Sequence, residues 1–215
     1  MTFTRTSLRA LAAASALLAL AAGIGPAAAT GNSVTVAVGE SIADGSHPLT
    51  AATAHVEMET QIAVWTCQSG TVPASPVSEV QSGASVEDVL QLRGLLFQGC
   101  SWMGGTMSTA LSSPAAFRVT GPATSGSSDV VQGRIENFAI SGGVSICNFT
   151  VSGSVRASLN ESTQKLTIDE SGRSGAFKVS RVSGCLGLVQ VGQAMDLRTT
   201  LQLTSPDGAI NVSGS

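Results

Sequence analysis

Hydrophobic and polar residues alternate along much of the chain with a period of two. From Ser33 to Val38, three valines alternate with Ser, Thr and Ala. Because successive side chains of a β-strand point to opposite faces, this pattern predicts a strand with one buried face. The same alternation recurs at residues 54–59, 147–151, 155–159, 177–179 and 197–203.

Turn-forming sequences separate these segments. Asn160–Gln164 is a polar five-residue connection between two alternating stretches, which predicts a hairpin loop. Other turn signals occur at residues 121–122, 125–128, 141–143, 171–172 and 206–208. Short strands with such frequent turns predict an all-β fold, an antiparallel β-sandwich of Greek-key, immunoglobulin-like or jelly-roll-like type. At most one short helix is expected, starting at Ser85, and a change of phase at Gly94 predicts a bulge.

The first 29 residues have the features of an export signal. Arg5 and Arg9 precede an apolar stretch at residues 11–22, and three alanines at 27–29 form a signal-peptidase site. We therefore expect residues 1–29 to be cleaved and residues 30–215 to form a single domain. The apolar stretch is shorter than the ~20 residues that span a bilayer, and no second one follows it. The mature chain is thus expected to be secreted, extracellular or loosely associated with the cell wall, without a transmembrane segment.

Charge excludes one class of partner. Residues 30–215 carry 9 Lys and Arg against 14 Asp and Glu, a formal charge of −5. Phosphate backbones are bound by basic surfaces, so nucleic acid is not an expected partner.

Four cysteines predict two disulfides in an exported protein. Three pairings are possible, and we favour Cys67 with Cys100 and Cys147 with Cys185, because each closes a short loop between strands that can return to one another. Crossed pairings would join the two halves of the chain. A zinc site would need closely spaced cysteine pairs, which are absent from the sequence.

The segments around the cysteines resemble a known group of proteins. Ala63–Cys67, Leu95–Cys100, Gly142–Cys147 and Ser183–Leu188 occur in this order, followed by a final strand near residues 197–204. This arrangement resembles the small secreted four-cysteine β proteins of high-GC Gram-positive bacteria over about residues 46–212. The resemblance implies the secreted, disulfide-bonded β fold and carries over no functional residue.

Candidates for chemistry are few. His55, Glu57 and Glu59 alternate on one predicted strand face and are weak candidates for metal ligands, although side chains along one flat strand diverge. A solvent-exposed strip is the simpler interpretation. His47 precedes Pro48 in a predicted loop and is expected to be a solvated surface residue. No nucleophile-elbow sequence accompanies either histidine, which argues against a catalytic triad. We therefore assign no catalytic residue, no metal and no cofactor.

Tryptophan residues near the cysteines have two interpretations. Trp65 and Trp102 each lie two residues from a cysteine, and either pack against the cystines or form an aromatic ligand platform. The first is favoured.

Three functions remain open. The first is a noncatalytic extracellular or cell-surface module that binds a protein, a glycan or a small apolar ligand through loops at one end. The second is a hydrolase of wall or environmental polymer. Its candidate acids are Glu57, Glu59, Asp88, Glu136 and Asp196. The third is a protease inhibitor that presents the segment at residues 72–80, stiffened by two prolines.

Overall fold

The structure is a computed structural model that describes residues 32–102, 105–126 and 128–214. The predicted signal peptide, residues 1–29, lies outside the described residues. The first eight strands are β1 (Val34–Val38), β2 (Gly45–Thr53), β3 (Val56–Glu59), β4 (Val64–Cys67), β5 (Ser69–Val72), β6 (Ser78–Val86), β7 (Asp88–Leu92) and β8 (Leu96–Trp102). The others are β9 (Gly105–Leu111), β10 (Ala115–Val119), β11 (Val130–Val144), β12 (Cys147–Asn160), β13 (Lys165–Glu170), β14 (Phe177–Gly184), β15 (Asp196–Thr204) and β16 (Ile210–Gly214).

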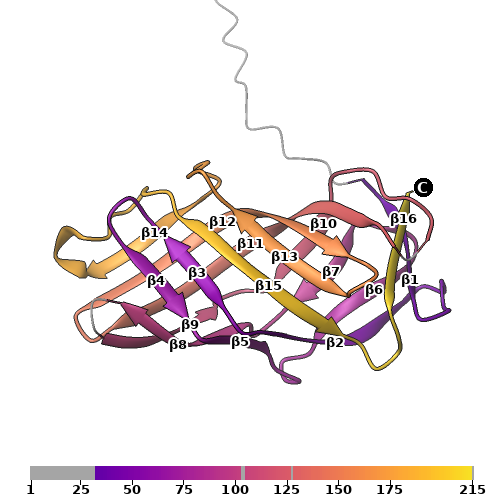
Figure 1. Cartoon of the computed structure of the whole chain (residues 1–215), viewed down its shortest axis with the longest axis horizontal. Coiled ribbons are helices and arrows are strands. Elements are labelled where there is room, and N and C mark those ends of the chain that lie inside the picture. The colour runs from indigo at the N-terminus through magenta and orange to yellow at the C-terminus, as the bar shows by residue number, and fades with distance from the viewer. Residues whose placement is uncertain (1–31, 103–104, 127, 215) are drawn as a thin grey trace, which may run out of the picture.

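All strands join one antiparallel sheet that curves back on itself (Figure 1). The longest strands, β11 and β12, pair with each other along the molecule and have different outer partners along their lengths. Strand β12 pairs first with β14 and then with β13, while β11 pairs with β10 and then with β9. On the opposite side, β2 pairs with β6 in its first half and with β5 in its second. Two sections of the sheet therefore close on themselves, and both contain β11 and β12. The opposed faces of the sheet enclose one hydrophobic core.

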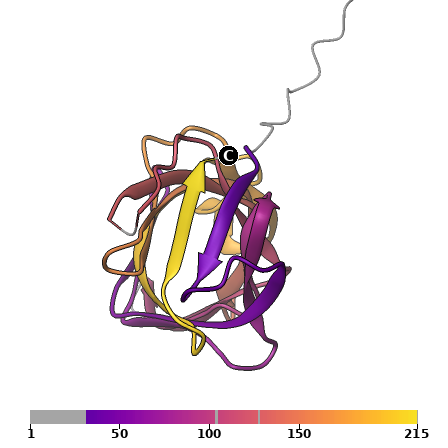
Figure 2. The same ribbon diagram turned by 90° about the vertical axis from the view of Figure 1, so that its right-hand side faces the viewer.

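Strands β1 and β16 cover one end of this elongated body (Figure 2). They pair with each other, and β1 also pairs with β6. Their valine and isoleucine side chains are buried, so the predicted alternation in Val34–Val38 is confirmed. Far-apart parts of the sequence thus meet here, the first described strand beside the last.

The core follows the alternation read from the sequence. The inward positions of β12, β14 and β15 carry the predicted apolar residues, and all of them are buried. The two disulfides join Cys67 to Cys100 and Cys147 to Cys185, which confirms the favoured pairing. The all-β antiparallel fold is likewise confirmed. Two disulfides are typical of proteins that fold in an oxidising compartment.

Three local predictions were wrong. Ser85 lies in strand β6 and not in a helix, because β6 pairs with both β1 and β2 and this pairing outweighs a weak capping motif. The helical turn that does occur is a 3₁₀ turn, η1 (Cys185–Gly187). Residues 141–143, predicted as a turn, belong to β11, and Gly94 lies in the turn between β7 and β8 and not in a bulge within a strand.

Candidate functional site

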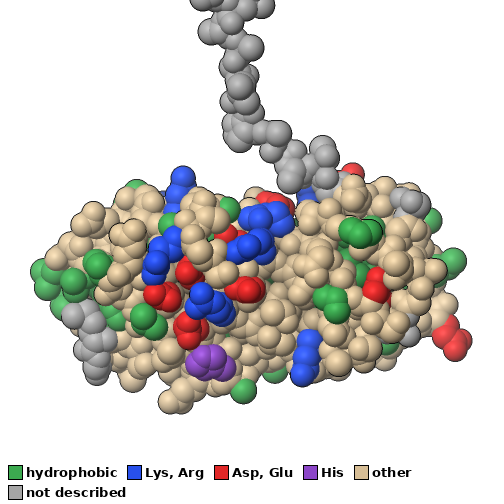
Figure 3. All heavy atoms as spheres, turned by 45° about the horizontal axis from the view of Figure 1, so that its top comes forward, with side chains coloured by type: hydrophobic (Ala, Val, Ile, Leu, Met, Phe, Trp, Pro, Cys, Tyr) green, Lys and Arg blue, Asp and Glu red, His purple; other side chains and the backbone are tan. Residues whose placement is uncertain are grey.

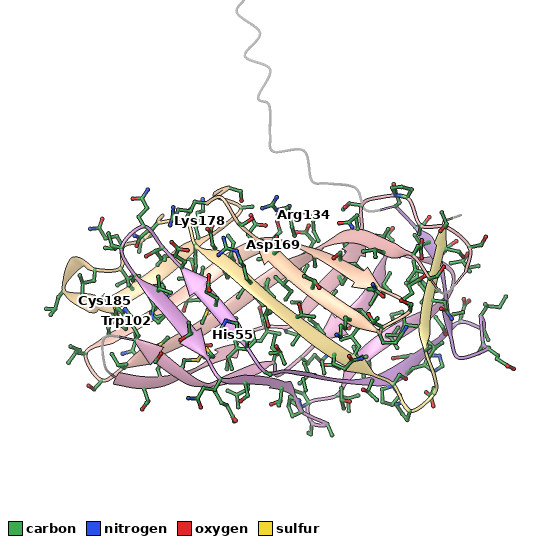
Figure 4. All side chains as sticks on the ribbon, viewed as in Figure 1. His55, Trp102, Arg134, Asp169, Lys178 and Cys185 are labelled. Carbon is green, nitrogen blue, oxygen red and sulfur yellow. A yellow bond between two sulfur atoms is a disulfide. The ribbon has the colours of Figure 1, made fainter. Side chains whose placement is uncertain are left out.

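The predicted metal ligands do not converge. His55 lies in the bend before β3, and its backbone N–H donates a hydrogen bond to the Thr53 hydroxyl 3.3 Å away (Figure 4). Glu57 and Glu59 follow on β3, and both carboxylates contact arginines. Within the described ranges, no three His, Cys, Asp or Glu side chains are grouped closely enough to hold a metal ion.

These two glutamates belong instead to a charged belt across the middle of one wall (Figure 3). Arg198 of β15 is its centre. Its Nη1 lies 2.8 Å from Glu57 Oε1, and its guanidinium lies 3.8–3.9 Å from carboxylate oxygens of Glu59, Asp169 and Asp196. Such exposed pairs contribute little individually, but here several share one arginine.

Each of the five acids considered for hydrolysis contacts an arginine. The pairs are Glu57 with Arg198, Glu59 with Arg173, Asp88 with Arg118, Glu136 with Arg134, and Asp196 with Arg198. All five carboxylates are therefore engaged in ion pairs with arginines.

Two buried carboxylates accept hydrogen bonds from backbone N–H groups near the point where β12 changes its partner strand from β14 to β13. Glu170, 1 % exposed, accepts a hydrogen bond of 2.8 Å from the backbone N–H of Arg156. Asp196 accepts one of 2.8 Å from the backbone N–H of Arg173. Both acids therefore accept hydrogen bonds from the backbone, a structural role.

Shallow grooves flank β13 beside the charged belt. One of about 600 Å³ is lined by polar and charged residues that include His55, Lys165 and Arg198. Another of about 560 Å³ shares Thr167 and Asp169 with it. Neither lining includes Trp or Phe, so these grooves do not offer the large aromatic surface on which sugar rings commonly pack.

The tryptophans form part of the core. Trp65 is fully buried, and its ring centroid lies 5.4 Å from those of both Trp102 and Phe149. Their packing in the disulfide-bonded end excludes the alternative of an exposed aromatic platform.

One polar constellation was missed by the sequence analysis. His47 belongs to β2 and is not a loop residue, and its Nδ1 lies 2.8 Å from Asp207 Oδ2. Its Nε2 lies 3.0 Å from Ser82 Oγ. This is the order of contacts found in a Ser–His–Asp triad. Residues so far apart in sequence gave no motif to read, since only the pairing of β2 with β6 brings Ser82 to His47.

The surroundings of this constellation do not suit a nucleophile. Ser82 is 4 % exposed, and its hydroxyl donates a 2.6 Å hydrogen bond to the Ala43 carbonyl. It lies within a strand, whereas a nucleophile elbow lies at a turn between a strand and a helix. The adjacent groove includes the acids Asp44, Glu87 and Asp88, which would repel a developing oxyanion. The hydrogen bonds of His47 with Ser82 and Asp207 instead connect β2 to β6 and to the β15–β16 connection.

The end opposite β1 and β16 carries exposed aliphatic side chains. We call it the apolar end and define it by Ile62, Val64, Ile146, Leu186 and Val191, which are 53–84 % exposed. These are five of the eight large hydrophobic side chains exposed in the described part of the chain. Val64 is the first residue of β4, and the other four lie in three connections, β3–β4, β11–β12 and β14–β15, that lie towards the same end (Figure 1).

Disulfides hold these connections close to the core. The Cys147–Cys185 bond links the β11–β12 and β14–β15 connections, and the Cys185 N–H donates a 3.1 Å hydrogen bond to the Ile146 carbonyl. Cys185 and Trp102 mark this end in Figure 4. The aliphatic residues are thus presented on a braced surface.

The cysteine-containing segments of the apolar end carry no charge, and charged residues border this end where Glu59 pairs with Val64 and where Arg173 donates to the Thr60 carbonyl. Each cysteine lies in a run without Asp, Glu, Lys, Arg or His, and these runs are residues 60–78, 94–117, 137–155 and 182–195. At the other end, the connections each contain at least one acid. These acids are Glu40, Asp44, Glu87, Asp129, Glu161 and Asp207. The molecule is therefore polarised along its long axis.

No helix among residues 32–102, 105–126 and 128–214 has the length and apolar character needed to cross a bilayer. Comparisons of the chain with models of protein families, with curated proteins and with solved structures found no match.

Proposed function

We propose that this protein is a secreted, noncatalytic extracellular or cell-surface module that binds its partner through the apolar end. The observation that supports this best is the gathering of exposed aliphatic side chains on uncharged connections braced by disulfides. Exposed apolar patches on an otherwise polar surface mark interaction sites. Loops on a rigid β scaffold are where such modules commonly bind.

The charged belt supports the noncatalytic part of the proposal. Its acids contact arginines, and its buried carboxylates hydrogen-bond to the backbone. These groups are committed to the fold, and a hydrolase would need at least one of them free to exchange a proton with substrate.

Site-specific photocrosslinking tests this function. A photoreactive side chain at Leu186 should crosslink to components of the extracellular or cell-surface fraction, and one at Ile42 should not. Ile42 is the matched control, because it is 65 % exposed and lies in the β1–β2 connection at the opposite end. Equal crosslinking from both positions would contradict binding through the apolar end.

The hydrolase remains a second candidate because of one observation, the Ser82–His47–Asp207 contacts. A fluorophosphonate probe labels an activated serine covalently. Labelling of the wild type that is lost in Ser82→Ala, with unchanged thermal stability, would support the hydrolase and contradict the noncatalytic module. We expect no labelling, since the Ser82 hydroxyl is buried.

A further inference from the structure

Two neighbouring turns form the most exposed part of the apolar end. Ile146 is 67 % exposed in the β11–β12 turn, and Leu186 is 84 % exposed in η1. The 3.1 Å hydrogen bond from Cys185 N–H to the Ile146 carbonyl holds the turns together. They present two aliphatic side chains side by side, with no ionisable residue in either connection.

Leu186 has an unusual backbone conformation in a turn that is closed by a 2.8 Å hydrogen bond from the Leu188 N–H to the Cys185 carbonyl. Its φ of 48° and ψ of 30° place it in the left-handed region, which is unfavourable for leucine and is usually occupied by glycine or asparagine. Its side chain points to solvent and buries little surface. An unfavourable backbone conformation combined with an exposed apolar side chain suggests a role in contact with something outside the chain.

The size of the apolar end argues against a second copy of the chain. Full burial of one aliphatic side chain removes roughly 60–120 Å² from water, so five partly exposed ones would cover roughly 200–400 Å². A stable interface needs about 800 Å² on each partner. A small apolar contact is better suited to a surface into which side chains insert, because that contact needs no complementary shape.

We propose that the apolar end docks on a lipid surface with neutral headgroups, with Ile146 and Leu186 inserted at the boundary between headgroups and hydrocarbon. This rests on the proposed function and names the partner of that site. Charge complementarity favours neutral lipids, because the nearest basic residues in the sequence are Arg156 for Ile146 and Arg181 for Leu186, and neither lies in the connections that carry these two residues. The acidic connections lie at the other end, so none of them is desolvated when Ile146 and Leu186 insert.

Vesicle sedimentation tests this with the oxidised, exported protein. The wild type should bind phosphatidylcholine vesicles, and the binding should persist at about 0.5 M salt, because it is apolar and not ionic. Vesicles enriched in phosphatidylglycerol should bind more weakly at low salt, because the protein is acidic. Stronger binding to phosphatidylglycerol would overturn the preference for neutral headgroups.

Substitutions at the two turns define the contact. Leu186→Asn, whose new residue suits the left-handed conformation, and Ile146→Ser should each lower the partition coefficient about tenfold. Ile42→Ser and Val130→Ser are matched controls, since both side chains are exposed away from the apolar end, and should leave it unchanged. Retained stability and disulfides in each variant exclude unfolding as the cause.

The outcomes separate this inference from the proposed function. If the wild type binds no vesicle while Leu186 still gives more crosslinking than Ile42, the lipid surface is wrong and binding through the apolar end stands. A monomer–dimer equilibrium abolished by Leu186→Asn would identify a second copy as the partner and overturn the lipid proposal. If neither vesicles nor crosslinking distinguish the apolar end, both proposals fail.

Discussion

Replacing Glu161 by Gln is expected to remove a pH dependence of stability. Glu161 lies between β12 and β13, is 2 % exposed, and accepts a hydrogen bond from the backbone N–H of Val212 in β16. Its Oε2 and Asp129 Oδ1 are both buried with no other partner. A proton shared between the two carboxyl groups satisfies both atoms. Burial, together with this hydrogen bond to Asp129, raises the pKa of Glu161 from 4.5 to about 8.

The sign of the effect follows from proton binding. The unfolded chain releases the Glu161 proton near pH 4.5, whereas the folded protein keeps it until about pH 8. Between these values the folded state binds more protons, so the free energy of unfolding falls as pH rises. The contribution is fully present below pH 4.5. Each pKa unit corresponds to about 1.4 kcal/mol, which gives a loss of at most about 5 kcal/mol by pH 8.

The partner acid titrates in a separate window. The hydrogen bond from Glu161, followed by those from Thr124, lowers the pKa of Asp129 below 3.8. The stability that Asp129 contributes is therefore lost only as pH falls through that lower value. It does not offset the change expected between pH 5 and pH 8.

Denaturant unfolding followed by tryptophan fluorescence measures the effect, because Trp65 is fully buried. The wild type should lose stability from about pH 5 to about pH 8, and Glu161→Gln should not, because its amide donates to Asp129 without ionising. Glu40→Gln, which changes an exposed acid at the same end, should keep the wild-type slope. An unchanged slope in Glu161→Gln would refute the shared proton.

Three further changes test the scaffold. Gly153→Ala should lower stability by more than about 2 kcal/mol, because a Cβ there would lie 1.8 Å from the Ala176 carbonyl oxygen and φ is 151°. Glu170→Gln should cost about 1.5–3 kcal/mol by weakening charged hydrogen bonds, measured by denaturant unfolding. Removing the Cys147–Cys185 bond by a double Ser substitution should cost about 3–4 kcal/mol, measured as a lower melting temperature.

Each of these has a control that separates it from a general effect of substitution. Gly172→Ala also has a positive φ but meets no atom within 4 Å, so it should cost clearly less than Gly153→Ala. Asp169→Asn changes the neighbouring acid, whose side chain is 61 % exposed, and should be close to neutral. A protein with both disulfides reduced should be less stable than the double Ser variant. Equal stabilities would show that the Cys67–Cys100 bond contributes nothing.

Local pattern was sufficient to predict the strands. In Val34–Val38, and in β12 and β15, apolar residues at every second position must face one side of a strand, so their burial follows from strand geometry alone. The hairpin at Asn160–Gln164 was also predictable, because it joins segments close in sequence. The observed disulfide pairing was the favoured one of three, because each bond closes a shorter loop than the crossed pairings would. Ser85 was mispredicted, because pairing with distant strands decided its conformation.

The sequence by itself therefore determined the class of the fold and the buried face of several strands, and it favoured the observed cystine pairing. Only the tertiary structure decided that the sheet closes twice around β11 and β12, that Arg198 and Arg173 contact the glutamates of β3, and that Ser82, His47 and Asp207 meet. It also decided that aliphatic residues from three separate connections share one end. The physical reason is that alternation reports which face of a strand is buried, whereas neighbours across strands depend on register and closure, which are set by the whole sheet.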